Sequence, residues 1–446
     1  MTFSTLALTP PLLKAIDECG YTEPTAVQAR TIPFALNGRD ILATAQTGTG
    51  KTASFVLPLL HQLSQGPDAD AGKRSPDVGD EYRRRPKRFR ALILVPTREL
   101  ALQVESSIHN YARHLAIKVM SMVGGEPYDR QKQQLIDGVD ILVATPGRFL
   151  DLRQQRALHC DEVRALVLDE ADRMLDMGFG NDIRKILALL PAQRQNLFFS
   201  ATLPKAVRTL AQAVVNNPVE IDITAAPSPT PLIEQWLIAT DKHNKSALLS
   251  QLIQQHTWSQ ALIFIRTQHG AAKLINQLAK RGITAETIHG GRSQASRKQI
   301  MSDFKTGKIA YLVATGIAAR GIDIHGLTRV VNYDLPDDTD DYLHRIGRTG
   351  RAGVKGEAVS LVSKDDFKRL CAIERRMNTI IERRTLEGFT VTKDLPPSNL
   401  DFVRQSKDKS PYAANAANKQ NALATPPPMT NAAVWAPWQQ KSKPYE

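Results

Sequence analysis

The sequence predicts an α/β protein with two domains, each a mainly parallel sheet flanked by helices. Apolar runs in the first half end in polar or glycine-rich residues, namely DILATA (40–45), ALILVP (91–96), DILVAT (140–145), ALVLDEA (165–171) and NLFFSAT (196–202). The pattern returns in ALIFIRT (261–267), AETIHGG (285–291), AYLVAT (310–315), RVVNYDLP (329–336) and GEAVSLV (356–362). Apolar strands that alternate with helices are typical of a parallel sheet covered on both faces, so each half predicts one domain.

Composition changes along the chain set the expected boundaries. Residues 224–232 contain three prolines, which interrupt helices and central strands, so we interpret them as a linker between domain 1 (1–223) and domain 2 (233–392). Residues 66–90 carry six cations in their last eight positions and are interpreted as an inserted, solvated loop, with auxiliary nucleic-acid contact as the alternative. Residues 393–446 form a basic, low-complexity segment, for which we expect a disordered tail.

The charge balance indicates a polyanionic partner. The formal net charge is +13 and the pI is about 9.6, which favours nucleic acid first and an anionic membrane surface second, against a merely soluble basic protein. No apolar run approaches the ~18 residues of a membrane span. The N-terminal residues lack the pattern of a secretory signal, and the three cysteines show no CxxC pair. We therefore expect a cytoplasmic protein without structural zinc.

The run ATAQTGTGKT (43–52) predicts a phosphate-binding loop, because it follows the first strand and opens a helix. Gly48 and Gly50 let backbone N–H groups approach phosphate oxygens, Lys51 supplies a positive charge, and Thr52 offers a hydroxyl to Mg²⁺. Ala45 stands where the strict pattern requires glycine. The alternative is an ordinary turn between a strand and a helix.

Two further motifs carry charges suited to phosphate chemistry. Asp169 and Glu170 follow a buried strand in VLDEADRML (167–175), where the first acid suits magnesium and the second can orient and deprotonate a water molecule. The alternative is an acidic helix N-terminus. HRIGRTGR (344–351) places three arginines at spacings of three, which predicts either a surface ion-pair face or arginine fingers that stabilise charge on a γ-phosphate.

These motifs are accompanied by GYTEPTAVQ (20–28), PTRELA (96–101), TPGR (145–148) and SAT (200–202). As a set, they resemble the motifs of the DEAD-box ATP-dependent RNA helicases of superfamily two, and most closely those of the bacterial RhlE-like branch. The resemblance spans residues 3–385 and keeps the family's motif order. It implies two RecA-like domains, ATP and Mg²⁺ as cofactors, and RNA as partner. It also removes the objection to Ala45, since alanine is normal at that position in the family.

The resemblance implies a role for each motif residue. The ATP site would comprise Phe3, Tyr21 and Gln28 around adenine, the loop residues Ala45, Gln46, Thr47, Gly48, Thr49, Gly50, Lys51 and Thr52, and Gly321 with Asp323 near the ribose. Thr52 and Asp169 would hold the metal, and Lys51, Asp169, Glu170, Arg348 and Arg351 would serve catalysis. Asp172, Ser200, Thr202 and His344 would couple nucleotide state to RNA.

The RNA-facing residues implied by the resemblance come from both domains. Domain 1 would contribute Pro96, Thr97, Arg98, Gly124, Gly125, Thr145, Pro146, Gly147 and Arg148, and domain 2 would contribute Arg266, Thr267, Gly290, Gln294, Arg297 and Thr315. Contacts to the RNA backbone carry no sequence information, so we expect broad RNA specificity. The family mechanism is closure of the two domains on ATP and RNA, which bends one strand and opens a short duplex.

Two rival functions and one departure from the family pattern stay open. A DNA helicase of the same superfamily is the enzymatic rival, and a passive RNA clamp without hydrolysis is the other. Gly316 stands where the family usually has Asp, and we expect it to weaken the coupling between RNA binding and hydrolysis. By resemblance, the RNA context is ribosome assembly or RNA turnover, with ribosomal RNA or RNA-processing complexes as partners and a monomeric catalytic core.

Overall fold

The computed structural model describes residues 2–45, 49–65, 88–223, 233–316, 326–350, 354–389, 391–392, 394–398 and 400. Most of the basic insertion, the proline-rich linker and the C-terminal segment from 401 therefore lie outside the described residues. Their predicted roles stay predictions.

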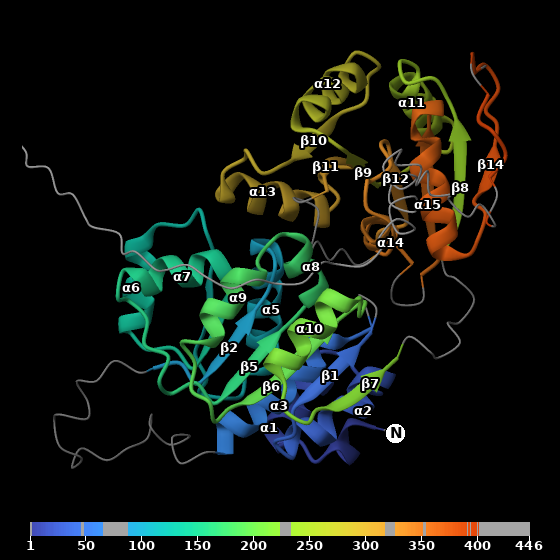
Figure 1. Cartoon of the computed structure of the whole chain (residues 1–446). Coiled ribbons are helices and arrows are strands. Elements are labelled where there is room, and N and C mark those ends of the chain that lie inside the picture. Colours follow the sequence, from blue (N-terminus) through green and yellow to red (C-terminus); the bar gives the residue numbers. More distant parts are fainter. Residues whose placement is uncertain are drawn as a thin grey trace, which may run out of the picture. The chain divides into compact units, whose positions relative to one another are not determined.

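The first sheet has seven strands in the order β3-β4-β2-β5-β6-β1-β7, and every neighbouring pair is parallel. Figure 1 labels β2, β5, β6, β1 and β7 of this sheet. Its strands are β1 (Ile41–Thr44), β2 (Ala91–Leu94), β3 (Val119–Met122), β4 (Ile141–Ala144), β5 (Ala165–Leu168), β6 (Gln195–Ser200) and β7 (Val219–Asp222). Because all strands run the same way, their carboxyl ends meet at one edge, where the predicted motifs follow them.

Helices cover both faces of this sheet. They are η1 (Phe3–Leu6), α1 (Pro10–Glu18), α2 (Ala26–Leu36), α3 (Lys51–Gln65), α5 (Arg98–Tyr111), α6 (Tyr128–Ile136), α7 (Pro146–Gln154), α8 (Ala171–Asp176), α9 (Gly180–Leu187) and α10 (Lys205–Val214). Alternate strand residues point to opposite faces. Ile93 therefore packs in the core with α1, α2, α3 and α5, whereas Leu92 packs in the core with α7, α9 and α10. Burial on both faces explains why these strands are apolar throughout.

The second sheet repeats the arrangement in the order β10-β11-β9-β12-β13-β8-β14, again with parallel pairs. Its strands are β8 (Ile233–Ala239), β9 (Ala261–Ile265), β10 (Ala285–Ile288), β11 (Tyr311–Thr315), β12 (Arg329–Asn332), β13 (Gly356–Val362) and β14 (Glu382–Arg384). Its helical segments are α11 (Lys245–Gln255), α12 (Gln268–Ala279), α13 (Gln294–Lys305), α14 (Thr339–Ile346), η2 (Lys364–Asp366) and α15 (Phe367–Met377).

Helices also cover both faces of the second sheet. Ile263 of β9 packs in the core with α11 and α12, while its neighbour Leu262 packs with α13 on the other face. The predicted fold class, two parallel sheets each flanked by helices, is therefore confirmed. Of the helices that the structure describes, none combines the length and apolar character needed to cross a bilayer.

Candidate active site and nucleic-acid interface

The predicted phosphate loop joins β1 to α3, and Lys51 is the first residue of that helix. Lys51 is buried, and its Nζ has no hydrogen-bond partner among the residues that the structure describes. A buried ammonium group without partners is costly, so this position favours an anionic ligand. Ala45 is buried at the end of β1, and Thr49, Gly50 and Thr52 are described, whereas Gln46, Thr47 and Gly48 lie outside the described residues.

Gln28 ties the first helices to this loop. Its Oε1 accepts from the backbone N–H of Thr25 at 2.9 Å, and its Nε2 donates to the carbonyl of Gly50 at 3.2 Å. Gly50 has a φ of +91°, and a side chain there would collide with the Gln28 amide. Glycine is therefore required here both by the backbone angle and by the close approach.

The two aromatic residues predicted near adenine differ in their surroundings. Phe3 is buried in the domain core, while Tyr21 is 49% exposed, with its ring centroid 6.4 Å from that of Tyr111. Tyr21 thus offers an aromatic face at the surface, whereas the support of the adenine pocket by Phe3 stays a prediction.

Asp169 and Glu170 follow β5 and have opposite pKa shifts although both are buried. Burial raises the pKa of the Asp169 carboxyl to about 6, although the positive charge of Lys51 opposes the rise. Burial would also raise the pKa of Glu170, but nearby positive charges together outweigh it and lower that pKa to about 2, with Arg173 contributing most among them. The Arg173 Nη1 lies 2.6 Å from the Glu170 Oε2.

Glu170 also has an uncommon backbone conformation. It is the N-cap of α8 with φ 53° and ψ 50°, in the left-handed region that costs a non-glycine residue roughly 1–2 kcal/mol. The Oδ1 of Asp169 accepts from the Glu170 N–H at 2.9 Å, which stabilises this turn. The strained residue is one of those for which a catalytic role is predicted.

Asp172 joins the predicted DEAD and SAT segments. Its Oδ2 accepts from the Ala201 N–H at 3.2 Å, the Thr202 N–H at 2.9 Å and the Thr202 Oγ1 at 3.0 Å. In turn, the Ser200 Oγ accepts from the Asp172 N–H at 3.3 Å and donates to the Thr202 carbonyl at 2.7 Å. The two segments therefore form one hydrogen-bonded unit at the ends of β5 and β6.

The predicted RNA-facing residues of domain 1 lie around Arg98, which follows Pro96 and Thr97 after β2. Thr97 caps α5, with its Oγ1 accepting from the Leu100 N–H at 3.2 Å. The Arg98 guanidinium packs directly on Gly124 and Gly125, since a Cβ at Gly125 would lie 2.5 Å from Arg98 Nη1. Gly125 also has a φ of +82°, so this pair of glycines makes room for the arginine.

Arg148, also predicted to contact RNA, points inward. It is buried, with its Nε donating to the Gln131 Oε1 at 3.0 Å and its Nη2 to the Glu126 carbonyl at 2.6 Å. Its Cζ lies 3.6 Å from the centroid of the Tyr128 ring. Arg148 thus holds the segment after Gly125 against α7, and its own contact with RNA stays a prediction.

The neighbouring residues of the same motif lie at the start of α7. Thr145 is the N-cap, and Pro146 and Gly147 occupy the first turn. A proline is tolerated there because the N–H that it lacks would have no partner within the helix. This end of α7 presents backbone N–H groups that suit an anion.

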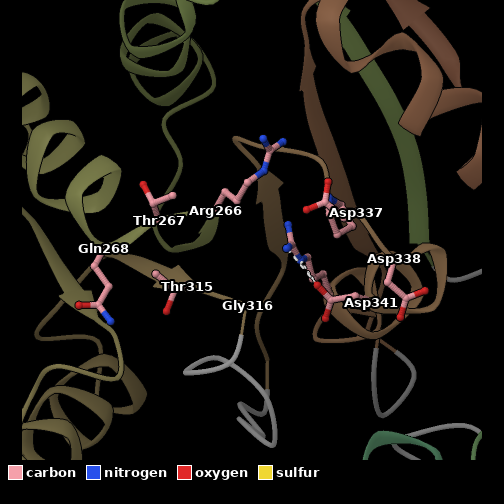
Figure 2. Close-up of a pocket in the computed structure, with 10 residues that line it drawn as sticks. Arg266, Thr267, Gln268, Thr315, Gly316, Asp337, Asp338 and Asp341 are labelled. Carbon is pink, nitrogen blue, oxygen red and sulfur yellow. Dashed lines mark hydrogen bonds and ion pairs between the residues drawn. The ribbon is translucent and has the colours of Figure 1, made fainter. Parts of the chain in front are cut away.

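In domain 2, several predicted RNA-facing residues surround one pocket of about 480 Å³ (Figure 2). It lies at the carboxyl ends of β9, β11 and β12 and is lined by Arg266, Thr267, Gln268, Thr315, Gly316, Pro336, Asp337, Asp338, Asp341 and Arg345. The chain leaves β9 and β12 on opposite sides of the sheet, and ligands of open α/β sheets bind at such switch points. Thr267 caps α12, with its Oγ1 accepting from the Gly270 N–H at 3.0 Å.

The remaining domain 2 residues lie on or just before α13. Gln294 and Arg297 occupy its first turn, Ser293 caps it, and Gly290 precedes the cap. These positions place a capped helix N-terminus beside the two polar side chains.

Gly316 lies beside an ion pair of α14. The Arg345 Nη2 is 3.0 Å from the Asp341 Oδ2, and a Cβ at Gly316 would lie 3.4 Å from each of these atoms. Arg345 also donates from Nη1 to the Asp334 carbonyl at 2.8 Å, and its Cζ lies 5.1 Å from the Phe264 ring centroid. The carboxylate of Asp341 therefore neutralises Arg345 although position 316 has no side chain.

Of the other predicted site residues in HRIGRTGR, the structure describes His344 and Arg348. His344 belongs to α14, and Arg348 follows the helix with its Nε donating to the His344 carbonyl at 3.1 Å. Arg351, together with Gly321 and Asp323, lies outside the described residues.

Sequence reasoning missed several residues at these sites. Arg173, which contributes most to lowering the pKa of Glu170, lies three positions further along α8, a spacing that brings side chains together on a helix. Asp341 lies four positions before Arg345 and was detectable by the same rule. Tyr128 and Gln131 had no such signal, because their partner Arg148 is distant in sequence.

A buried lysine at the start of α3, adjacent acids at a strand end and a second parallel sheet with capped helix ends define a nucleotide-binding protein with two RecA-like domains. Comparison with known proteins supports a narrower assignment. Residues 25–210 match the DEAD/DEAH box helicase family, and residues 244–353 match the helicase conserved C-terminal domain. The chain belongs to the DEAD/DEAH box helicases, and it is an ATP-dependent RNA helicase of that family.

The relatives share most of their length with this chain. It is 41% identical over 372 residues to the ATP-dependent RNA helicase CshA of Listeria monocytogenes, covering 83% of this chain and 68% of that protein. It is 39% identical to the ATP-dependent RNA helicase SrmB of Haemophilus influenzae, covering 91% and 89%. The structure of S. cerevisiae Dbp5 bound to RNA and ADP BeF3 has a TM-score of 0.75 at 32% identity, covering 86% and 95%. The predicted family is confirmed.

Proposed function

We propose that residues 1–223 bind ATP with Mg²⁺, and that domain 2, residues 233–392, closes on the nucleotide and on RNA to separate short duplexes. The observation that carries the proposal is Lys51, a buried cation whose Nζ has no partner among the described residues and whose charge acts on Asp169 and Glu170. A triphosphate supplies the negative charge that this position lacks. ATP use follows from the family, and the assignment of each residue is our proposal.

The acidic pair fits a divalent cation. Thr52 would offer its hydroxyl and Asp169 its carboxylate, both oxygen ligands that Mg²⁺ prefers. The raised pKa of Asp169 reflects a buried carboxylate with too little compensating charge, which a cation offsets. When bound, the ion would neutralise phosphate charge.

Glu170 is best placed to orient the attacking water. With a pKa of about 2 it is ionised at neutral pH, and its Oε2 is already held by Arg173. Such a carboxylate accepts a hydrogen bond readily but is a weak base, so orientation of the water is its main role while the pair with Arg173 persists. Loss of that pair would raise its basicity.

The bonds of Asp172 with Ala201 and Thr202 support a coupling role. Movement of the DEAD segment on ATP binding must shift the SAT segment with it, because one carboxylate holds both. In the closed state, Arg348 and Arg351 would approach the γ-phosphate, Asp323 the ribose, and His344 the DEAD and SAT segments. Since ATP and RNA would both stabilise this state, each should tighten binding of the other by the same factor.

Arg98, the capped helix ends and the polar pocket of domain 2 support a grip on the RNA backbone rather than on bases. Broad RNA specificity follows, with ribosomal RNA or RNA-processing complexes as the proposed context. We further propose a monomeric catalytic core that works in the cytoplasm.

The test compares ATP hydrolysis stimulated by single-stranded RNA with that stimulated by DNA of the same sequence and length. We expect RNA to stimulate strongly and DNA weakly, because 2′-hydroxyl contacts distinguish the two. Equal stimulation would contradict the RNA assignment, and RNA binding without any hydrolysis would favour the passive clamp.

A further inference from the structure

Asp366 is a buried carboxylate at the centre of an ion-pair cluster in domain 2. It is the last residue of η2 and is 5% exposed. Its Oδ2 accepts from the Lys245 Nζ at 3.0 Å and from the Ser363 Oγ at 2.7 Å. Its Oδ1 lies 3.6 Å from the Arg266 Nη2 and 3.5 Å from the Arg369 Nη1. One carboxylate thus joins segments far apart in the sequence.

The cluster keeps this carboxylate ionised. Burial alone would raise the pKa of Asp366, but Lys245 and the hydrogen bonds from Ser363 and Lys245 lower it below its ordinary value. Lys245 is itself buried, and its Nζ also donates to the Tyr333 carbonyl at 2.9 Å and lies 3.6 Å from the Asp334 Oδ1. Each buried charge therefore has an opposite charge at contact distance, as burial requires.

Arg266 is held by this cluster along one edge. Its backbone N–H donates to the Asp334 Oδ2 at 3.0 Å, and its Nη2 donates to the Leu335 carbonyl at 3.3 Å. Within the described part of the chain, the polar contacts of its side chain all use Nη2, and 40% of the side chain is exposed. The Nε and Nη1 atoms are therefore available to a ligand at the pocket that Arg266 lines with Thr267 and Thr315 (Figure 2).

A guanidinium can hold a carboxylate on one edge and a phosphate on another, because its five donors lie in one rigid plane. We propose that Asp366 is a positioning residue for RNA binding, which fixes the Nη2 edge of Arg266 so that its other edge faces an RNA phosphate at the pocket. This inference rests on the proposed function, in which Arg266 contacts RNA. Neither the helicase motifs nor the sequence around Asp366 assigns it such a role.

The first experiment is a double-mutant cycle on the full chain. We measure the Kd for a single-stranded RNA in the presence of a nonhydrolysable ATP analogue, for the wild type, Arg266→Ala, Asp366→Asn and the double variant. Arg266→Ala should weaken RNA binding about fivefold and lower the salt dependence by roughly one phosphate contact. Asp366→Asn should weaken it about threefold, and should add nothing to Arg266→Ala.

The control is Asp365→Asn, which makes the same charge change at the exposed neighbouring residue and should leave the RNA Kd unchanged. ATP affinity without RNA should be unchanged in every variant, which separates a positioning role from general unfolding. If Asp366→Asn weakens RNA binding equally with and without Arg266, it acts through general loss of structure and the proposal is wrong.

Arg266→Lys provides a test that leaves the buried residues Asp366 and Lys245 unchanged. Lysine keeps the charge but cannot hold a carboxylate on one edge and a phosphate on another. We expect an RNA affinity close to that of Arg266→Ala, and wild-type affinity would overturn the positioning role. If Arg266→Ala itself has no effect, the RNA contact is wrong and the positioning role falls with it, while RNA-stimulated hydrolysis still tests the proposed function separately.

Discussion

The two sheets have the same strand order, so each strand of the first has a counterpart in the second. β1 corresponds to β8 and β5 to β12, each with equivalent neighbours. The helix after β1 begins at Lys51, and the helix after β8 begins at Lys245. The local sequences are also alike, with Lys-Thr-Ala at 51–53 and Lys-Ser-Ala at 245–247. An acid follows each corresponding strand, Asp169 after β5 and Asp334 after β12.

The two lysines differ in what surrounds them. The Nζ of Lys51 has no hydrogen-bond partner among the described residues, whereas Lys245 contacts the carboxylates of Asp366 and Asp334 and the carbonyl of Tyr333. In domain 2 the chain's own carboxylates neutralise the lysine, whereas we propose that a ligand does so in domain 1. On this proposal, the same topology serves ligand binding in one domain and internal stability in the other.

The largest expected difference is between the acids of the two domains. Glu170→Gln should lower the rate of ATP hydrolysis about a thousandfold, since it removes the carboxylate that orients the water, and should leave an ATP-dependent RNA clamp. Asp334→Asn, its control in domain 2, should keep turnover measurable. Steady-state hydrolysis and RNA release rates check both, and unaffected RNA release in Glu170→Gln would contradict the proposed cycle.

The next largest difference is expected between the effects of replacing Lys51 and Lys245. Lys51→Ala should weaken ATP binding and lower hydrolysis about a hundredfold, because it removes charge from the phosphate site. It should not reduce thermal stability, since Lys51 has no described hydrogen bond to lose. A melting temperature well below that of the wild type would show that Lys51 has a structural partner.

Lys245→Met should have the opposite profile. Removal of the ammonium leaves Asp366 buried without its main partner, which should cost about 3 kcal/mol of unfolding free energy. ATP affinity of the folded protein should be unchanged. Denaturant unfolding and equilibrium nucleotide binding measure the two effects. A loss of ATP binding without a loss of stability would contradict the structural role of Lys245.

Asp366→Asn should reduce stability in a pH-dependent way. Because the pKa of Asp366 is lowered in the folded protein, its stabilisation is present above the ordinary value of 3.8 and is lost as pH falls through the lower folded value. The variant should lose about 2 kcal/mol at pH 7, and the difference should fade below pH 3.8. Urea unfolding at several pH values, beside Asp365→Asn, checks this, and a loss independent of pH would contradict it.

The smallest effect is expected at Gly316. An Asp there would give the Arg345 Nη2 a second acceptor beside Asp341, linking the end of β11 to α14. We expect Gly316→Asp to raise RNA-stimulated hydrolysis about threefold, less than 1 kcal/mol of coupling. Gly316→Ala is the control, because its Cβ would make ordinary contact without a charge. An unchanged or lower rate in the Asp variant would refute the coupling role.

Much of the proposed nucleotide site could be derived from the sequence because its residues are adjacent along the chain. The loop that ends in GKT lies between a strand and a helix that are adjacent in the sequence, and so do the two acids after β5. The positions of these residues therefore follow from the local sequence. The central strands were predictable for a similar reason, since burial on both faces makes them continuously apolar. The edge strands β3, β7 and β14 were not predicted, because they are partly exposed and carry polar or charged residues. The edge strand β10 was predicted, whereas β8, which lies inside the second sheet, was missed because it contains Glu234 and Gln235.

The sequence by itself determined the fold class, the family and the positions of the chemistry-bearing motifs, because local hydrophobic patterns and short loops specify them. Only the tertiary structure decided which charges are neutralised. Asp366 meets Arg266 across 100 positions of the chain, and Arg148 turns inward to Gln131. Lys245 is paired, whereas the Nζ of Lys51 has no hydrogen-bond partner among the residues that the structure describes. Electrostatic energy depends on distance in space and on burial, and neither can be read from separation along the chain.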